Sequence, residues 1–160
     1  MVVKKWVLIL IFLFFISFSC VYASTLNFEY YTYQGAKQSL ANHKGRYVLL
    51  NLFASYCPSC MIELNSLNKV SKACPNSKVQ VVSLMVDRES SYLLPKLVAS
   101  KSLTYEVGLA PANVNKFFPD FSKVPTTYLL NPEGKVIERI VGFKSSNAFL
   151  QLLSKYVSCN

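Results

Sequence analysis

The sequence predicts an α/β fold in which helices cover both faces of one mixed sheet. Strand-like and helical segments alternate along the chain, as in folds whose strands are joined through helices. The run 47–53, YVLLNLF, is almost continuously apolar, which is typical of a strand buried on both faces. Near the end of the chain, two strand-like runs flank the turn sequence 131–134, NPEG. We therefore expect a mostly parallel sheet with an antiparallel edge.

Apolar spacing and proline positions define the other elements. Segment 58–73 is expected to be a helix, because a proline stands just inside its start and Met61, Leu64 and Leu67 fall on one face. Pro95 marks a kink or boundary within a second helix. Further strands are expected at 30–33, 78–86, 104–107, 126–130 and 135–141, and further helices at 89–100, 111–118 and 145–156.

The composition excludes several classes of protein. Of the 160 residues, 52% are apolar and 16% are charged, so the chain has enough apolar side chains to offset the entropy of folding. Its five cysteines are too sparse for a small scaffold held together by disulfides. The net charge of +9 is dispersed, without a dense basic run, and this argues against nucleic-acid binding.

Residues 1–23 are expected to be a signal peptide. Lys4 and Lys5 precede the apolar run 6–16, and residues 21–23 fit the small-x-small pattern that precedes a cleavage point. Two alternatives remain open, an uncleaved membrane anchor and a lipid-modified Cys20. Cleavage would leave a single domain, 24–160, with four cysteines at 57, 60, 74 and 159.

Cys57 and Cys60 form a Cys-Pro-Ser-Cys pair at the point where a buried strand meets a helix. There the first sulfur faces unpaired N–H groups and the positive end of the helix dipole, which favour a nucleophilic thiolate. The second cysteine lies one turn later, close enough to resolve a mixed disulfide. The pair is therefore predicted to be a redox-active disulfide in which Cys57 attacks and Cys60 resolves.

Other uses of this pair fit the sequence less well. Haem attachment requires a histidine directly after the second cysteine, and that residue is Met61. A structural zinc site requires four ligands, and only Cys74, Cys159 and His43 remain to complete one. We therefore expect neither a metal nor another cofactor. An inert structural disulfide stays open as an alternative, and in that case the chain would be a binding module.

The segments 50–60, LNLFASYCPSC, and 123–136, KVPTTYLLNPEGKV, resemble the active-site and cis-proline segments of the thioredoxin-like superfamily. Cys60 and Pro125 are 65 positions apart, which is more than in thioredoxin and indicates an αβ insertion between them. The chain thus resembles the TlpA/ResA-like extracytoplasmic thiol–disulfide oxidoreductases over about residues 45–156. The resemblance implies a thioredoxin-like fold with an extra N-terminal strand.

This resemblance also implies a substrate groove. Pro125 would be the cis-proline that faces Cys57, and Val124 would offer its backbone to an extended substrate chain. Thr126 and Tyr56, beside the two motifs, would complete the groove.

Two further residues correspond to acidic positions of the family. Glu63 matches an acidic residue that is common in the subfamily, and it would exchange a proton with Cys60 one helical turn away. The alternative is an ordinary first-turn glutamate that the helix dipole favours. Asn51 stands where thioredoxin has a buried aspartate, and an asparagine cannot carry that proton.

Related branches can be compared with the sequence. Peroxiredoxins carry Pro-x-x-x-Thr-x-x-Cys, and the matching positions here are Leu50 and Ala54, so peroxidase chemistry is not expected. The sequence Lys-Val-Pro-Thr at 123–126 differs from the Gly-Val-Pro-Glu of the cytochrome-c-maturation branch, which argues against a dedicated role in haem proteins. No cationic residue lies between the cysteines, which favours a reductant over a strong oxidant, although an oxidase or isomerase of the same fold stays open.

The partners and the compartment are likewise implied by the resemblance. Substrates would be extracytoplasmic proteins with disulfides, with apocytochrome c as one candidate, and a membrane thiol reductase would supply electrons. The protein would be a monomer in the periplasm or another extracytoplasmic space, either released after export or anchored to the inner membrane.

The last two cysteines follow the helices 58–73 and 145–156. In a thioredoxin-like sheet these helices cover the same face and run away from the active-site edge, so their far ends could meet. We therefore expect a structural disulfide between Cys74 and Cys159, with two free thiols as the alternative.

Overall fold

The computed structural model describes residues 25–75 and 77–159, so the expected signal peptide, 1–23, lies outside the described residues. Seven strands form one sheet in the order β2-β1-β5-β4-β3-β6-β7. The strands are β1 (Glu29–Thr32), β2 (Lys37–Ser39), β3 (Tyr47–Phe53), β4 (Val79–Met85), β5 (Glu106–Leu109), β6 (Thr126–Leu130) and β7 (Val136–Val141). The helices are α2 (Pro58–Ala73), α3 (Leu94–Ser100), α4 (Val114–Phe117) and α5 (Ser146–Leu153), with two 3₁₀ helices, η1 (Leu40–His43) and η2 (Arg88–Leu93).

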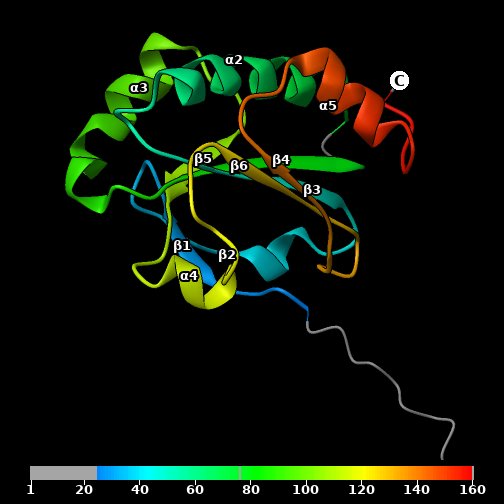
Figure 1. Cartoon of the computed structure of the whole chain (residues 1–160), viewed down its shortest axis with the longest axis horizontal. Helices are drawn as coiled ribbons and strands as arrows, with labels where there is room; N and C mark the ends of the chain where they lie inside the picture. The colour runs from blue at the N-terminus through cyan, green and yellow to red at the C-terminus, as the bar shows by residue number, and fades with distance from the viewer. Residues whose placement is uncertain (1–24, 76, 160) are drawn as a thin grey trace, which may run out of the picture.

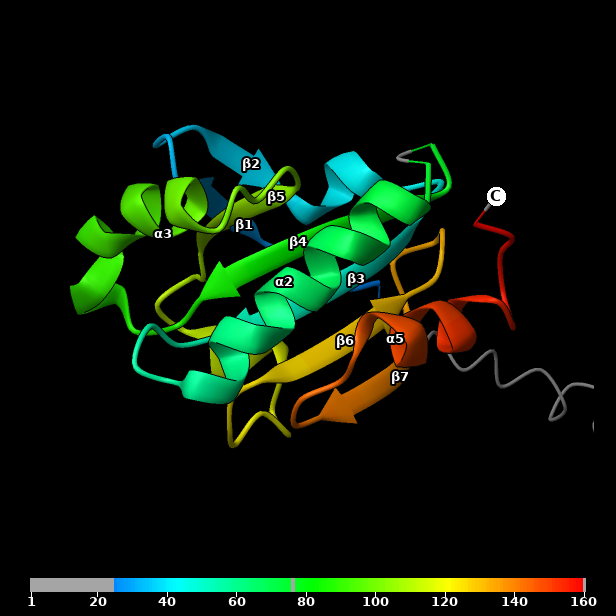
Figure 2. The same cartoon turned by 90° about the horizontal axis from the view of Figure 1, so that it is seen from above.

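Helices lie on both faces of the sheet, and their cover is unequal. Figures 1 and 2 show α2, α3 and α5 on one face, and Figure 1 shows the short α4 on the other. An apolar cluster fills each side, and the cluster on the α4 side is rich in aromatic residues, among them Phe28, Phe118 and Tyr128. The Phe118 and Tyr128 ring centroids are 4.3 Å apart, so aromatic packing supplies much of the contact that the single turn of α4 is too short to provide.

The central strand β3 carries the site. It pairs in parallel with β4 and antiparallel with β6, and its last six residues are buried. Side chains alternate between the two faces of a strand, so Leu49 and Phe53 pack in the cluster beneath α2, and Leu50 packs in the cluster on the opposite face. Asn51 is therefore placed on the α2 face, between two apolar neighbours.

Helix α2 begins and ends where its sequence predicts. Cys57 is the N-cap residue, and Pro58 occupies the first turn, where its missing N–H costs no hydrogen bond. Leu64 and Leu67 are buried against the sheet. The helix ends at Cys74, which has an extended backbone, and Pro75 follows.

The expectation of a mostly parallel sheet is wrong. Only β3–β4 and β4–β5 are parallel, and the other four pairings are antiparallel. The difference comes mainly from an N-terminal hairpin of β1 and β2, since β2, with the polar sequence Lys-Gln-Ser, gives no strand signal. Gly108 allows β1 to pair with β5, because a Cβ there would clash with the Tyr31 carbonyl oxygen.

The αβ insertion differs in detail from expectation. The expected helix 89–100 is two elements, η2 and then α3, because Pro95 occupies the first turn of a new helix. The expected strand 104–107 lies two residues later, as β5, because the Asn68 side chain accepts the Thr104 N–H and holds this residue outside the sheet.

The two later helices are shorter than expected. The expected helix 111–118 is the single turn α4, and it ends before Phe118, because a residue that precedes a proline disfavours the helical region. The expected helix 145–156 has Ser145 as its N-cap and ends at Leu153, where turns follow.

Cys74 and Cys159 are joined in a disulfide, with their Cα atoms 4.4 Å apart. Figure 2 shows α2 and α5 side by side on one face of the sheet, which brings the segments that follow them together. The bond closes a loop with a sequence separation of 85 residues and ties the C-terminal segment to the end of α2.

We expect the paired substitution of Cys74→Ala and Cys159→Ala to lower the free energy of unfolding by about 4 kcal/mol, because the unfolded chain regains the entropy of a long open loop. Denaturant unfolding followed by circular dichroism measures this. Ser158→Ala, beside the disulfide, is the control and should unfold like the wild type. Equal midpoints for the paired variant and the wild type would contradict a stabilising role.

Candidate active site

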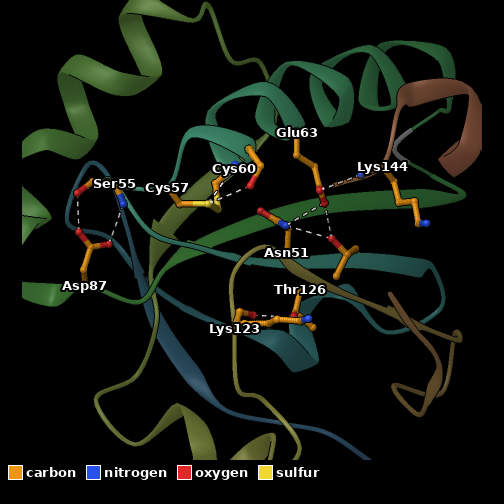
Figure 3. Close-up of a disulfide and its surroundings, with 11 residues drawn as sticks. Asn51, Ser55, Cys57, Cys60, Glu63, Asp87, Lys123, Thr126 and Lys144 are labelled. Carbon is orange, nitrogen blue, oxygen red and sulfur yellow. Dashed lines mark hydrogen bonds between the residues drawn. A yellow bond between two sulfur atoms is a disulfide. The ribbon is translucent and has the colours of Figure 1, made fainter. Parts of the chain in front are cut away.

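The Cys57–Cys60 disulfide lies at the edge of the sheet where β3 passes into α2 (Figure 3). The two Cα atoms are 5.2 Å apart. Cys57 is 8% exposed and Cys60 is fully buried. An approaching group can therefore reach the first sulfur, whereas the second is enclosed by protein.

The start of α2 stabilises negative charge on the Cys57 sulfur. The Cys60 N–H donates a hydrogen bond to Cys57 Sγ at 3.2 Å, and Ser59 Oγ lies 3.4 Å from the same sulfur. The dipole of the helix points its positive end at this position. Once the disulfide is reduced, these groups favour a thiolate on Cys57, which is the nucleophilic form.

Glu63 is buried within a network that joins α2 to two strands and a loop. Its Oε1 accepts hydrogen bonds from Thr127 Oγ1 at 2.9 Å and from Asn51 Nδ2 at 3.3 Å. Its Oε2 accepts the backbone N–H of Lys144 at 3.1 Å, from the loop that leads to α5. The carboxyl group is only 1% exposed and lies beyond the first turn of α2, which contains no acidic residue, so Glu63 is not the first-turn glutamate of the alternative.

Burial sets the protonation of this carboxyl group. Loss of solvent raises the pKa of Glu63 from 4.5 to about 7, because the charged form is poorly solvated inside the protein. The hydrogen bonds from Thr127 and from the Lys144 backbone, together with the Lys144 charge, act in the opposite direction and are outweighed. A group that titrates near neutral pH is suited to both accepting and donating a proton.

The bond between Val124 and Pro125 is cis. Thr126, the first residue of β6, pairs with Leu52, so Pro125 lies at the same edge of the sheet as the loop that carries Cys57. Val124 packs against the apolar cluster that contains both cysteines. Within the described part of the chain, nothing hydrogen bonds to the Val124 backbone, so its N–H and C=O are available to an extended ligand.

The other two expected groove residues are placed differently from each other. Tyr56 is 74% exposed beside the disulfide. Thr126 is fully buried, and its hydroxyl donates to the Lys123 carbonyl at 2.8 Å, a hydrogen bond that holds the turn before β6. Two further exposed apolar side chains are Ile62, two residues after Cys60 on α2, and Phe143, next to Lys144 in the sequence.

Sequence reasoning missed a clamp on the cysteine loop. Asp87, just after β4, is buried, and its carboxylate accepts the Ser55 N–H at 3.0 Å and the Ser55 hydroxyl at 2.5 Å. Figure 3 shows this pair on the far side of the disulfide from Glu63. An acidic residue at the carboxyl end of a buried strand is the signal that could have indicated it.

Among the residues that the structure describes, no group of three or more His, Cys, Asp and Glu side chains could hold a metal ion. None of the helices described is long and apolar enough to cross a membrane.

Several known proteins resemble this chain in sequence. The pattern of the AhpC/TSA family matches residues 21–139. The thiol–disulfide oxidoreductase ResA of Bacillus cereus is 26% identical over 131 residues, which are 81% of this chain and 74% of that protein. ResA of Bacillus subtilis is 29% identical over 116 residues, which are 72% of this chain and 64% of that protein.

Solved structures share the fold. A thioredoxin-family thiol:disulfide interchange protein from Chlorobium tepidum superposes with a TM-score of 0.74 at 24% identity, and it covers 82% of this chain and 93% of its own. StoA from Bacillus subtilis superposes with a TM-score of 0.67 at 23% identity, with 79% and 96% covered. The expected thioredoxin-like fold and the resemblance to ResA-like oxidoreductases are confirmed.

The buried carboxyl group should make stability depend on pH. The folded state holds the Glu63 proton more tightly than the unfolded state does, so between about pH 4.5 and 7 the wild type should lose about 3 kcal/mol of stability as the pH rises. Glu63→Gln has no titrating proton at this position, so it should lose less stability over the same pH interval. Denaturant unfolding at pH 5 and pH 8 compares the two proteins. Parallel pH dependences would contradict the raised pKa.

Proposed function

Because the chain belongs to the AhpC/TSA family, we propose that it is an exported thiol–disulfide oxidoreductase that reduces or exchanges disulfides in extracytoplasmic proteins. The observation that carries the proposal is the Cys57–Cys60 disulfide at the start of α2, with one sulfur accessible and a cis-proline at the same edge of the sheet. Its relatives named as thiol–disulfide oxidoreductases support the same chemistry.

The reaction proceeds in two exchanges. The Cys57 thiolate attacks a substrate disulfide, forms a mixed disulfide and releases one substrate thiolate, which takes a proton from solvent. Cys60 then gives up its proton and attacks Cys57 Sγ, which releases the second substrate thiolate. Glu63, one turn further along α2, serves as the proton acceptor. The substrate gains two electrons, and the protein ends with its Cys57–Cys60 disulfide.

The substrate is an extended polypeptide segment. Val124 presents an open backbone N–H and C=O, which suits short strand-like pairing with such a segment. Tyr56, next to Cys57 in the sequence, and Phe143, next to Lys144, are 74% and 44% exposed and offer apolar contacts to such a segment. Lys123 and Lys144 are exposed nearby and favour acidic neighbours of the substrate cysteine.

The compartment and partners follow from the same proposal. An export signal at 1–23, cleaved or kept as an anchor, places the domain 24–160 in the periplasm or another extracytoplasmic space. A membrane thiol reductase returns the disulfide to the dithiol state, and the protein works as a monomer. Apocytochrome c is one candidate substrate, although the Lys-Val-Pro-Thr sequence at 123–126 departs from the form of the dedicated haem-pathway branch.

Peroxide reduction, known from peroxiredoxins, fits this site poorly. In peroxiredoxins a proline and a threonine accompany the reactive cysteine, and this chain has Leu50 and Ala54 at the matching positions. Both side chains are fully buried and apolar, so neither can bind a peroxide beside Cys57. The geometry supports exchange between a dithiol and a disulfide instead.

We expect the wild type to accelerate the reduction of insulin by dithiothreitol. Cys57→Ser should reduce the rate to the uncatalysed background, because it removes the nucleophile. Cys60→Ser should accumulate a mixed disulfide with the substrate, which non-reducing gels detect. Lys155→Ala, on the exposed turn after α5, is the control and should keep full activity.

The same purified proteins separate the alternatives. No acceleration by the wild type would indicate a binding module with an inert disulfide. A redox potential near the approximately −120 mV of DsbA, measured by thiol trapping against glutathione, would indicate a net oxidant.

A further inference from the structure

Asn51 holds a buried oxygen that has no hydrogen-bond partner. Its side chain is 1% exposed, and among the described residues its Oδ1 is the only buried side-chain nitrogen or oxygen atom without a partner. A buried acceptor without a donor costs free energy, so its retention beside a reactive pair calls for an explanation.

The hydrogen-bond network fixes which way the amide points. Thr127 Oγ1 donates its proton to Glu63 Oε1, so it can only accept from Asn51. Glu63 Oε1 also accepts. The group of Asn51 that faces both oxygens must therefore be the NH₂, with Nδ2 at 3.0 Å from Thr127 Oγ1 and 3.3 Å from Glu63 Oε1. The carbonyl oxygen is left on the other side of the amide.

That oxygen is directed to the disulfide. Asn51 lies on the α2 face of β3 between Leu49 and Phe53, and these two belong to the same packed cluster as Cys60. Figure 3 shows Asn51 between the disulfide and Glu63, with its nitrogen turned to Glu63 and its oxygen turned to the cysteines. In the disulfide state, neither sulfur carries a proton to donate.

We propose that Asn51 Oδ1 accepts a hydrogen bond from the Cys60 thiol when the disulfide is reduced, and that it thereby stabilises the dithiol state. Reduction breaks the S–S bond, adds two electrons and two protons, and places one of these protons on Cys60. The new S–H supplies the donor that Oδ1 lacks. The inference rests on the proposed function, because it requires the disulfide to cycle.

The same contact serves the resolving step. While the Cys60 thiol donates to Asn51 Oδ1, the NH₂ group of the same amide donates a hydrogen bond to Glu63. When Cys60 attacks the mixed disulfide, its proton passes to the Glu63 carboxylate and the hydrogen bond to Asn51 is lost. Asn51 thus links the redox state of the cysteines to the position of the proton acceptor.

The test is the equilibrium of the full-length protein with glutathione, measured by thiol trapping. Asn51→Leu keeps a similar volume and removes the acceptor. We expect this variant to need a more reducing glutathione mixture. Its equilibrium constant for reduction should be about tenfold lower, which corresponds to a reduction potential more negative by about 30 mV.

Thr127→Val is the matched control. Like Asn51→Leu it removes one donor to Glu63 Oε1, and it leaves Asn51 Oδ1 in place. We expect its equilibrium constant to stay within about twofold of the wild-type value, well short of the tenfold change that defines the effect. The inference would be overturned if the equilibrium constant of Asn51→Leu equalled that of the wild type. It would also be overturned if Asn51→Leu and Thr127→Val lowered the equilibrium constant by the same factor. A disulfide that neither glutathione nor dithiothreitol reduces would overturn the proposed function, and this inference with it.

A second measurement observes the hydrogen bond directly and begins with a variant that keeps Asn51. In Cys57→Ala, Cys60 is a free thiol, and its S–H stretching band in the infrared moves to lower frequency when the proton is hydrogen bonded. We expect the band of a hydrogen-bonded thiol in Cys57→Ala alone, and its return to the unbonded position when Asn51→Leu is added. A band at the unbonded position in Cys57→Ala would refute the contact, even with the disulfide chemistry intact.

Discussion

Helix α2 packs across β3 on the face that carries Leu49, Asn51 and Phe53, and this contact determines most of the site. It buries Cys60 and Glu63 together, since both lie on the side of the helix that faces the sheet. It also leaves Cys57 at the helix start, where the cap is partly accessible. One packing contact therefore separates a partly accessible nucleophile from a fully buried resolving group.

Burial of polar groups at this contact has a cost that the network only partly offsets. Three hydrogen bonds reach the Glu63 carboxyl group, from two strands and a loop, and they favour its charged form. Desolvation still dominates and keeps the pKa near 7. A fully compensated carboxylate would stay ionised and could not return a proton. The incomplete compensation is what makes the group useful as both acceptor and donor.

Much of this arrangement could be predicted from the sequence, because local signals specify it. The apolar run 47–53 predicts the bounds of β3, and the proline at the start of segment 58–73 predicts where α2 begins, because each signal is local in the sequence. The contacts of Glu63 with Thr127 and Lys144 could not be predicted from the sequence. They depend on the register of the strands and on a loop that is 81 residues away in the sequence. Strand β2 was missed for a related reason, since its polar sequence gives no local signal and it joins the sheet by pairing with β1, which in turn pairs with β5.

The burial of the two sulfurs also bears on the direction of the chemistry. Cys57 is 8% exposed and Cys60 is fully buried, so a substrate or a reducing partner must begin at Cys57 in both directions of the cycle. The order of attack is then set by access and does not require a large difference between the two thiol pKa values. What the buried side controls is the balance between dithiol and disulfide, since Asn51 and Glu63 face only Cys60's side of the pair. Loss of the Asn51 acceptor should therefore change the equilibrium, whereas substitutions around Tyr56 and Val124 should change which substrates are used.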